Sequence, residues 1–474
     1  MIKGSKISGL LALALCFWLS TAPAHAQSIT EKNDKSSSVV RPLLQNIEIQ
    51  EPAAQTPLVR KTGSSTPVIS NSAPALSTAR SSYPILAETV IPGYSGVLVE
   101  TLDGGVVVES GSDTAFNPAS NVKIATAYAV LKTFGPSYRF PTSVWTDGSY
   151  EESTGTIYGN LYVSGRDPVF GYEHAVDLAA EMNRMGIKKV NGDLIVTDNF
   201  TMNYGLSPAR ASQTLFQSLD AVKRPAAAKR VWETYLINAG RLSQTDGNPG
   251  VAFTGTAYVQ PMPSNAKLLF THESAPMREI VKTTLCYSNN FIAERLGDML
   301  GGPSAVARIV QQNTGVGVNE FYLQTSSGLG VNRVTPSAMM KLLRIFRNDL
   351  ARYKMSFADI MPVAGLDKGT LENRFDTDFS SGSVIGKTGT LGNTDGGVSA
   401  LAGEINTRNG KLLFVIFNQR GSVSRFRAFQ NNYVSLIQGQ FGGAAPISYT
   451  PVALDVRMAK SRFTYPDQAS FGND

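Results

Sequence analysis

The chain has 474 residues, of which 42% are hydrophobic and 17% charged, and its formal net charge is +6 at pH 7. The positive charges form no basic run, so the composition argues against a nucleic-acid-binding protein. A mildly basic surface instead suits a polyanionic partner such as the cell wall.

The N-terminus predicts export. Within residues 1–26, Lys3 and Lys6 precede an apolar run that is too short to cross a bilayer and that ends in the small-residue stretch APAHAQ. We therefore expect a cleaved signal peptide, a location in the periplasm and no membrane span in the mature chain. Residues 27–85 are rich in Ser, Thr, Pro, Asn and Gln, which predicts a disordered tether.

Histidine and cysteine are scarce after this cleavage. His174 and His272 are then the only histidines, which disfavours a Ser-His-Asp triad or a histidine-rich metal site. We expect both to be structural, and we expect neither a metal ion nor another cofactor. Cys286 is left as the single thiol, so an intramolecular disulfide is excluded.

The folded part is expected to begin near residue 86. Residues 86–139 and 229–444 form the main domain, in which two strand-like runs around an Asp-Gly turn precede a helical block and three more runs follow it. This order predicts an α/β fold of the α+β type, with one antiparallel five-stranded sheet flanked by helices. Residues 140–228 mix strand-like and helical patterns and predict an inserted α/β subdomain, while 445–474 predict a weakly ordered tail.

One helix within the main domain carries a serine and a lysine on the same face. Asn117 is its expected N-cap, Pro118 its first residue and Gly135 its C-terminal cap. Ser120 then lies in the first turn, and Lys123 follows one turn later.

These two residues suggest nucleophilic catalysis. A serine hydroxyl needs a base within hydrogen-bond reach, and burial can lower the pKa of lysine by several units from about 10.4. Ser120 is therefore a candidate nucleophile and Lys123 its proton acceptor. The spacing alone is weak evidence, because Ser264 and Lys267 repeat it without a helix start.

Two further motifs strengthen the interpretation. Ser288–Asn290 interrupts an otherwise apolar helical segment, where buried polar side chains need partners. Lys387–Thr390, with the sequence KTGT, falls on a predicted strand. A second Lys-Thr-Gly at residues 61–63 lies in the predicted tether, before any fold. The three motifs lie at a helix start, at a helix interruption and at the edge of a sheet. Together they thus form one coherent candidate site.

The three motifs together resemble the active site of penicillin-binding proteins and serine β-lactamases. Longer stretches are similar to peptidase family S13, the D-alanyl-D-alanine carboxypeptidases and endopeptidases also called class C, type-4 penicillin-binding proteins. They are GNLYVSGRDP, GIKKVNGDLIVTDNF, SSGLGVNRVTP, MPVAGLDKGTLENRF and KTGTLGNTDGGVSALAGEI. The resemblance covers about residues 90–440 and implies the penicillin-binding-protein fold.

The resemblance also implies roles for the first two motifs. Ser120 would be the acylated nucleophile and Lys123 its general base. Ser288 would relay a proton to the leaving amine, and Asn290 would bind the substrate amide and steady Lys123.

For the third motif, the resemblance implies that Lys387 supplies positive charge near Ser288 and, with Thr388 or Thr390, holds the peptide's terminal carboxylate. Gly389 belongs to the same substrate-binding run. The backbone N–H groups of Ser120 and Thr390 would form the oxyanion hole. Asp167 matches the family's Gly-Asp-Pro aspartate and would contact the diamino acid of the substrate, although a turn residue before proline is an equal alternative.

The chain departs from the family pattern in two places. Arg166 replaces the glycine before the aspartate, and Thr325–Gly330 replaces the family stretch DGSGLS and loses its acid. We expect both changes at the rim of the cleft, where they bear on substrate preference more than on acylation.

The sequence therefore predicts a serine DD-peptidase that acts on peptidoglycan stem peptides and is acylated by β-lactams. A β-lactamase and a catalytically idle wall-binding or β-lactam-sensing protein are alternatives, and accidental motifs in a structural domain are a third. Trimming of stems and cleavage of cross-links use the same acylation chemistry, so the motifs favour neither. They also carry no information on oligomeric state.

Overall fold

The computed structural model describes residues 79–241 and 247–466. The predicted signal peptide, residues 1–26, and the tether up to residue 78 lie outside this part. The predicted tether end at residue 85 is wrong, because Ala79 is already buried and Arg80 forms a β-bridge with Glu109.

The described residues form both helices and strands. The helices are α1 (Pro84–Glu88), α2 (Val122–Phe134), α3 (Tyr172–Arg184), α4 (Pro208–Leu219), α5 (Ala226–Asn238), α6 (Met277–Tyr287), α7 (Asn290–Met299), α8 (Pro303–Thr314), α9 (Pro336–Arg352), α10 (Val423–Gln440) and α11 (Leu454–Met458), with short 3₁₀ turns η1 (Ala119–Asn121), η3 (Phe357–Asp359) and η4 (Thr394–Gly396). The strands are β1 (Tyr94–Thr101), β2 (Val106–Ser110), β3 (Pro141–Thr146), β4 (Ser149–Glu151), β5 (Thr156–Tyr158), β6 (Leu161–Gly165), β7 (Lys189–Asn191), β8 (Leu194–Val196), β9 (Ala252–Phe253), β10 (Ala257–Val259), β11 (Lys267–Glu273), β12 (Phe321–Tyr322), β13 (Arg333–Val334), β14 (Val384–Leu391), β15 (Val398–Thr407), β16 (Gly410–Gln419) and β17 (Arg462–Thr464). None of the described helices is both long enough and apolar enough to cross a bilayer.

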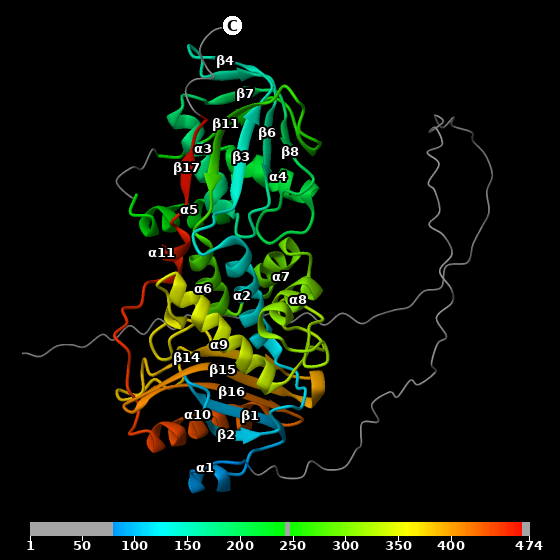
Figure 1. Cartoon of the computed structure of the whole chain (residues 1–474). Helices are drawn as coiled ribbons and strands as arrows, with labels where there is room; N and C mark the ends of the chain where they lie inside the picture. Colours follow the sequence, from blue (N-terminus) through cyan, green and yellow to red (C-terminus); the bar gives the residue numbers. More distant parts are fainter. Residues whose placement is uncertain (1–78, 242–246, 467–474) are drawn as a thin grey trace, which may run out of the picture. The chain divides into compact units, whose positions relative to one another are not determined.

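The predicted five-stranded antiparallel sheet is confirmed. Its order is β14-β15-β16-β1-β2, so the hairpin from the start of the domain adds to three strands from its end. Leu98 and Val415 face one layer of helices, which includes α2 and α9, while Val97 and Ile416 face α10. Figure 1 shows α9 and α10 on opposite sides of this sheet. Apolar residues on both faces of each strand explain why the sheet is buried on both sides.

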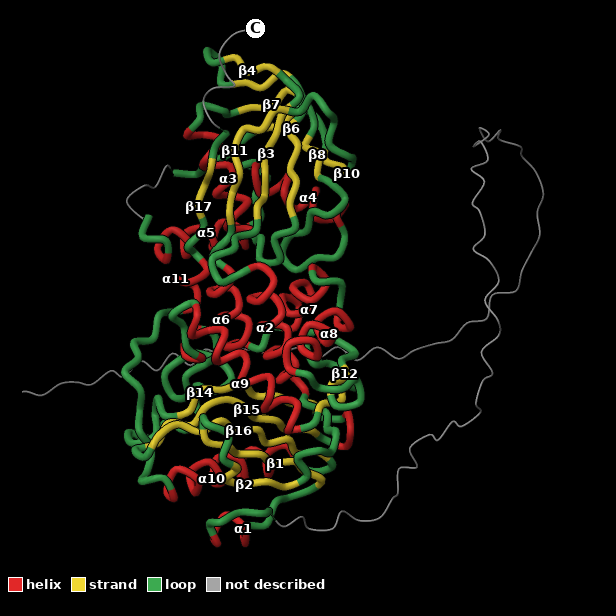
Figure 2. Tube along the Cα trace, viewed as in Figure 1, coloured by secondary structure: helices red, strands yellow, loops and turns green. Residues whose placement is uncertain are grey.

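The insertion is longer than predicted and contains most of a second sheet, whose order is β10-β8-β6-β3-β11-β17. It also contains a four-stranded sheet, whose order is β4-β5-β7-β9. Strand β11, at residues 267–273, pairs with β3, so the expected end of the insertion at residue 228 is wrong. The later end of the insertion was missed because β9 and β10, which follow a helix, have only two and three residues. We propose that the insertion runs from Pro141 to Glu273. Figure 2 shows its strands apart from the first sheet, with α2, α6 and α9 between the two groups.

The C-terminal segment is also more ordered than predicted. The sequence predicts weak order for residues 445–474, but the part up to residue 466 contains α11 and β17. Thr464 pairs with Thr271 at the edge of the second sheet. Backbone pairing fixes this segment although it has little hydrophobic periodicity.

Candidate active site

The predicted nucleophile lies in a short turn before helix α2. Ala119–Asn121 form η1 and the α-helix begins only at Val122, so the predicted start at Pro118 is wrong by about one turn. The predicted end is confirmed, because the Gly135 N–H donates to the Leu131 carbonyl. The serine therefore lies where the turn meets the helix, beside backbone N–H groups that have no partner within the helix.

The residue before the nucleophile is strained. Ala119 has a left-handed backbone with φ 47° and is completely buried. This conformation costs a non-glycine residue about 1–2 kcal/mol, so it persists only where the surroundings enforce it. One such constraint is Asn117, whose Oδ1 accepts a hydrogen bond from the Ala119 N–H at 3.0 Å.

Two glycines let neighbouring segments press against this turn. A Cβ at Gly328 would lie 2.0 Å from the Ala119 carbonyl oxygen, and a Cβ at Gly389 would lie 2.6 Å from the Pro118 carbonyl oxygen. Both distances are shorter than any real contact, so a larger residue at either position would displace the turn. Close packing against this turn therefore explains why the KTGT motif has a glycine at position 389.

Lys123 lies beneath the nucleophile and is 1% exposed. Its Nζ lies 3.1 Å from Ser120 Oγ, 2.7 Å from Asn290 Oδ1 and 2.6 Å from the Ser327 carbonyl oxygen. Burial lowers the pKa of Lys123 to about 7, although the Glu294 carboxylate raises it in part. The predicted pairing of serine and lysine side chains is present in the structure.

These contacts fit a neutral amine. A neutral amine has two hydrogens and one lone pair, and the carbonyls of Asn290 and Ser327 can only accept hydrogen bonds. When both hydrogens point at these two oxygens, the lone pair is directed at the Ser120 hydroxyl. The geometry therefore prepares Lys123 to take the hydroxyl proton.

The second motif interrupts a helix, as the sequence predicts. Helix α6 ends just before Ser288, which adopts a left-handed conformation with φ 56°, and α7 begins at Asn290. The Asn289 side chain caps α7 by accepting a hydrogen bond from the Ile292 N–H at 3.1 Å. The break places Asn290 within hydrogen-bond reach of Lys123.

The third motif lies on β14, at the edge of the first sheet, as the sequence predicts. Lys387 is fully buried, and its Nζ donates to the Thr388 carbonyl oxygen at 2.8 Å. Burial, with a smaller effect of the nearby Lys123, holds the pKa of Lys387 well below its ordinary value. The amine expected to supply positive charge is therefore enclosed and does not line the pocket described below, while Thr390 is exposed.

One pocket joins the three motifs and has a volume of about 640 Å³. Its lining includes Ser120, Ser288, Asn290, Thr388, Thr390, Leu329, Gly369, Thr370, Asn373, Arg374, Arg427 and Asn431. The first five are predicted from the sequence. The two arginines, the asparagines and the Gly369–Thr370 pair were missed. Gly369, Thr370, Asn373 and Arg374 lie in the family-like stretch MPVAGLDKGTLENRF, to which no role was assigned, whereas Arg427 and Asn431 lie outside every such stretch.

The stretch that departs from the family pattern lies closer to the base than predicted. The sequence places residues 325–330 at the rim, but Ser327 is fully buried and its carbonyl accepts from Lys123. Glu294 holds this stretch by accepting the N–H groups of Ser326 and Ser327 at 3.1 and 2.9 Å. Glu294 lies four residues after Asn290 on α7, a spacing that could have identified it from the sequence.

Thr325 occupies the position at which the family stretch has its acid. Its Oγ1 accepts from the Gly328 N–H at 3.0 Å and donates to the Leu329 carbonyl oxygen at 2.8 Å. The threonine hydroxyl therefore closes the turn without a charge.

Asp167 does not line the pocket that holds Ser120. It is 3% exposed, and its Oδ1 accepts from the Val169 N–H at 2.9 Å. Burial raises the pKa of Asp167 to about 6. This position agrees with a turn residue before Pro168 and argues against the predicted substrate contact. Arg166 lines a separate pocket between the insertion and helix α7.

The two histidines are buried, and neither lines the Ser120 pocket. His174 Nδ1 accepts from the Gly171 N–H at 3.0 Å at the start of α3, and burial holds the pKa of His272 well below its ordinary value. In the described part of the chain, no three His, Cys, Asp or Glu side chains are grouped as metal ligands would be.

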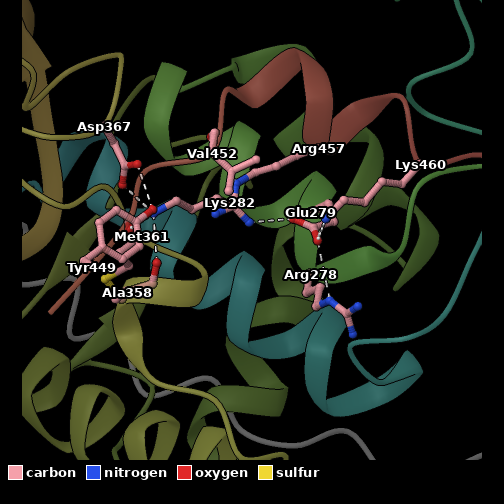
Figure 3. A network of polar contacts seen from close by, with 10 residues as sticks. All are labelled: Arg278, Glu279, Lys282, Ala358, Met361, Asp367, Tyr449, Val452, Arg457 and Lys460. Carbon is pink, nitrogen blue, oxygen red and sulfur yellow. Dashed lines mark hydrogen bonds and ion pairs between the residues drawn. The ribbon is translucent and has the colours of Figure 1, made fainter. Parts of the chain in front are cut away.

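A buried ion pair anchors the segment that follows η3 onto helix α6 (Figure 3). Lys282 and Asp367 are both inaccessible, and their Nζ and Oδ2 atoms lie 2.5 Å apart. The same amine donates to the Ala358 and Met361 carbonyl oxygens, and Tyr449 donates to the other Asp367 oxygen at 2.8 Å. Every charge in this cluster is thus compensated, as burial requires.

The C-terminal segment also holds the outer part of α6 (Figure 3). Glu279 is 3% exposed and accepts from Arg457 and Lys460, each at 2.7 Å. The segment therefore contacts α6 twice before it joins the second sheet as β17.

The anchored segment then reaches the pocket. The Thr370 N–H donates to the Cys286 carbonyl oxygen at 3.0 Å, and a Cβ at Gly369 would lie 2.2 Å from the same oxygen. Because Cys286 lies two residues before Ser288, this contact sets the spacing between Ser288 and the pocket wall that carries Arg374.

A model of the D-Ala-D-Ala carboxypeptidase 3 (S13) family matches residues 85–211 and 219–437. The chain belongs to this family. The resemblance stated from the sequence is thereby confirmed, and the protein is a serine-type peptidase of the DD-carboxypeptidase class.

Similar proteins agree with this assignment. A D-alanyl-D-alanine carboxypeptidase of an Actinomadura species is 25% identical over 76% of this chain and 84% of its own length. The D-alanyl-D-alanine carboxypeptidase DacB of Haemophilus influenzae is 24% identical over 66% of this chain and 82% of its own.

Solved structures show the same fold. A penicillin G-acylated predatory endopeptidase of Bdellovibrio bacteriovorus has a TM-score of 0.65 at 23% identity, covering 75% of this chain and 95% of that chain. Penicillin binding protein 4 of Haemophilus influenzae has a TM-score of 0.55 at 21% identity, covering 74% and 96%.

Proposed function

We propose that the protein hydrolyses the D-Ala-D-Ala end of peptidoglycan stem peptides through an acyl-enzyme on Ser120. The observation that carries this proposal is the Lys123 amine, buried and 3.1 Å from the Ser120 hydroxyl, next to a pocket lined by all three motifs. Family membership supports the reaction class.

In the acylation step, Lys123 takes the proton of Ser120 as Oγ attacks the penultimate carbonyl carbon. The backbone N–H groups of Ser120 and Thr390 stabilise the oxyanion, an effect that is typically worth several kcal/mol. The C–N bond then breaks, and the proton held by Lys123 passes through the Ser288 hydroxyl to the leaving amine of the last D-alanine, so that Lys123 is neutral again and Ser288 keeps its proton. Asn290 orients the substrate amide and keeps the Lys123 amine in place.

In the second step, water attacks the ester carbonyl and gives up a proton to Lys123. The C–O bond to Ser120 breaks, and the serine regains its proton. The shortened stem and the free serine are the products, so the site returns to its starting state without a cofactor.

A penicillin would follow the same first step, because its strained amide presents a carbonyl carbon to the same hydroxyl. We further propose that the protein acts in the periplasm, which the sequence of its N-terminus supports.

Labelling with a fluorescent penicillin tests the nucleophile. Ser120→Ala should abolish labelling, while Ser264→Ala, in the second Ser-x-x-Lys copy, should label like the wild type. Persistent labelling of the Ser120→Ala protein would overturn the assignment.

Mass spectrometry of digested sacculi tests the reaction. Release of D-alanine, or conversion of cross-linked dimers to monomers, supports the proposal. Binding to sacculi without either product would support an idle wall-binding protein, and rapid turnover of nitrocefin would support a β-lactamase.

A further inference from the structure

The side chain of Asn117 joins three separate segments around the nucleophile. Asn117 is fully buried. Its Oδ1 accepts from the Ala119 N–H at 3.0 Å. Its Nδ2 donates to the Gly330 carbonyl oxygen at 2.9 Å and to Asp395 Oδ2 at 2.7 Å. The oxygen and both N–H bonds of the amide thus have partners, and only this orientation of the amide serves all three.

Asp395 is itself held by a salt bridge. It lies in η4, between β14, which carries the KTGT motif, and β15. Arg333 donates from Nη1 to Asp395 Oδ2 at 3.0 Å and from Nη2 to Oδ1 at 2.9 Å. Such a bidentate pair is among the stronger polar contacts in proteins. The carboxylate that accepts from the Asn117 amide therefore cannot turn away without breaking this pair.

The backbone brings these groups together. Phe116, which precedes Asn117, exchanges two backbone hydrogen bonds with Val334, at 3.0 and 2.9 Å. Arg333 is the residue before Val334. Asp395 has a left-handed backbone with φ 52°, a conformation that aspartate and asparagine adopt more readily than most residues. The pairing of Phe116 and the bend at Asp395 thus place both ends of the network beside the nucleophile's turn.

The network reaches both groups that take part in acylation. At one end it holds the N–H of Ala119, the strained residue before Ser120. At the other end it holds the carbonyl of Gly330, in the same stretch as Ser327, whose carbonyl oxygen accepts from Lys123. Rotation of the amide would release both contacts. The 3.1 Å separation between the hydroxyl and the amine therefore depends on this one side chain.

We infer that Asn117 and Asp395 are positioning residues for the acylation of Ser120. Neither lines the pocket that holds Ser120, so both act through the turn and not on the substrate. A displacement of reacting groups by about 1 Å can lower a rate about 100-fold. The inference rests on the proposed function, because it concerns the step in which the serine attacks the carbonyl carbon.

Exchange of the amide and the carboxylate tests this contact. Asn117→Asp keeps the shape of the side chain, but the new carboxylate cannot donate and faces Asp395. Asp395→Asn keeps an acceptor and the left-handed backbone but removes the charge that holds Arg333. In the double variant, the exchanged amide can again donate to the exchanged carboxylate.

Time courses of labelling at increasing concentrations of a fluorescent penicillin separate the affinity of the non-covalent complex from the rate constant of acylation. Asn117→Asp should lower this rate constant about 100-fold and Asp395→Asn about tenfold, while the affinity changes little. The double variant should be acylated faster than Asn117→Asp alone. If Asn117→Asp does not fold, Asp395→Asn and Arg333→Gln decide the question, because both change partly exposed side chains.

Glu100→Gln is the matched control. Glu100 pairs with Arg344 at side-chain exposures of 14% and 29%, close to the 19% and 34% of the Asp395–Arg333 pair. Neither Glu100 nor Arg344 lines the pocket. Thermal unfolding compares the stability of the variants, and Glu100→Gln should keep the acylation rate constant of the wild type whatever stability it loses.

The outcomes separate this inference from the proposed function. A wild-type acylation rate constant in Asp395→Asn and Arg333→Gln would overturn the inference, as would equal slowing in Glu100→Gln or a loss that lies wholly in the affinity. A double variant no faster than Asn117→Asp would overturn the direct coupling of the two side chains. A wild type that is not labelled at all would overturn the proposed function, and this inference with it.

Discussion

The rate of acylation should depend on pH through Lys123. The amine is buried, and its pKa is lowered to about 7. Because only the neutral amine can accept the Ser120 proton, the rate should fall about tenfold for each pH unit below 7 and reach a plateau above about pH 8. At pH 5 it should be roughly one hundredth of the plateau value. For a lysine with its ordinary pKa, the rate would still be rising at pH 9.

The assay is the second-order rate of labelling by a fluorescent penicillin between pH 5 and pH 9. Lys123→Arg should abolish labelling throughout, because a guanidinium stays protonated. Asp167 is the necessary control, since burial raises its pKa to about 6, within the same range. Asp167→Asn should keep the profile. A flat wild-type profile, a rate still rising at pH 9, or loss of the acid limb in Asp167→Asn would rule out Lys123 as the titrating base.

Four further changes test the base and its surroundings. Glu294→Gln removes a negative charge that raises the pKa of Lys123, so the midpoint of the labelling profile should move to lower pH; an upward move would contradict this. Because the pKa of Lys123 is lower in the folded than in the unfolded chain, the folded chain binds fewer protons between about pH 7 and pH 10. The unfolding free energy of the wild type relative to Lys123→Met should therefore rise over this range, and a constant difference in urea titrations would count against a buried neutral amine. Gly328→Ala should abolish labelling, because its Cβ would lie 2.0 Å from a carbonyl oxygen of the nucleophile's turn; normal labelling would show that the turn tolerates displacement. Lys282→Met should cost about 3–5 kcal/mol of unfolding free energy by leaving Asp367 unpaired, whereas replacing both residues with apolar ones should recover much of it. Urea titrations measure both, and a loss well below this range would show that the pair contributes little.

The chemistry of the site could be predicted from the sequence because it depends on local spacing. Ser120 and Lys123 are three residues apart near a helix start, and such residues meet whatever the rest of the fold does. The helix break at Ser288 and the edge strand at Lys387 also carry local signals. The positions of the strand-like runs also predicted that strands from both ends of the domain share one antiparallel sheet, although not their order.

The other features of the site depend on contacts between segments that are distant in the sequence. Arg374 and Arg427 reach the pocket only because their loop and helix pack beside β14, and no spacing relates them to Ser120. The family pattern predicts that Lys387 faces the substrate, but the strand turns its amine toward the Thr388 carbonyl. Asp167 was predicted to contact the substrate because it matches the same family pattern, but the fold buries it in the insertion.

The predicted boundaries of the insertion and of the C-terminal tail were wrong for a related reason. Strand β17 has three residues and exists because it pairs with β11, nearly two hundred positions earlier in the chain. Short edge strands have little periodicity of their own. Their position depends on unpaired backbone N–H and C=O groups at the edge of a neighbouring sheet. The sequence of the tail carries no information about that edge.

The proposed function depends on Lys123 activating Ser120 and no other serine in the pocket. Tandem mass spectrometry of the penicillin-treated protein measures this directly, because the acyl adduct marks the nucleophile. We expect one adduct per chain, on Ser120, which is absent from Lys123→Arg. An adduct on Ser288, Ser327 or Ser264, or an undiminished adduct on Ser120 in the Lys123→Arg protein, would show that another pair of groups carries the reaction.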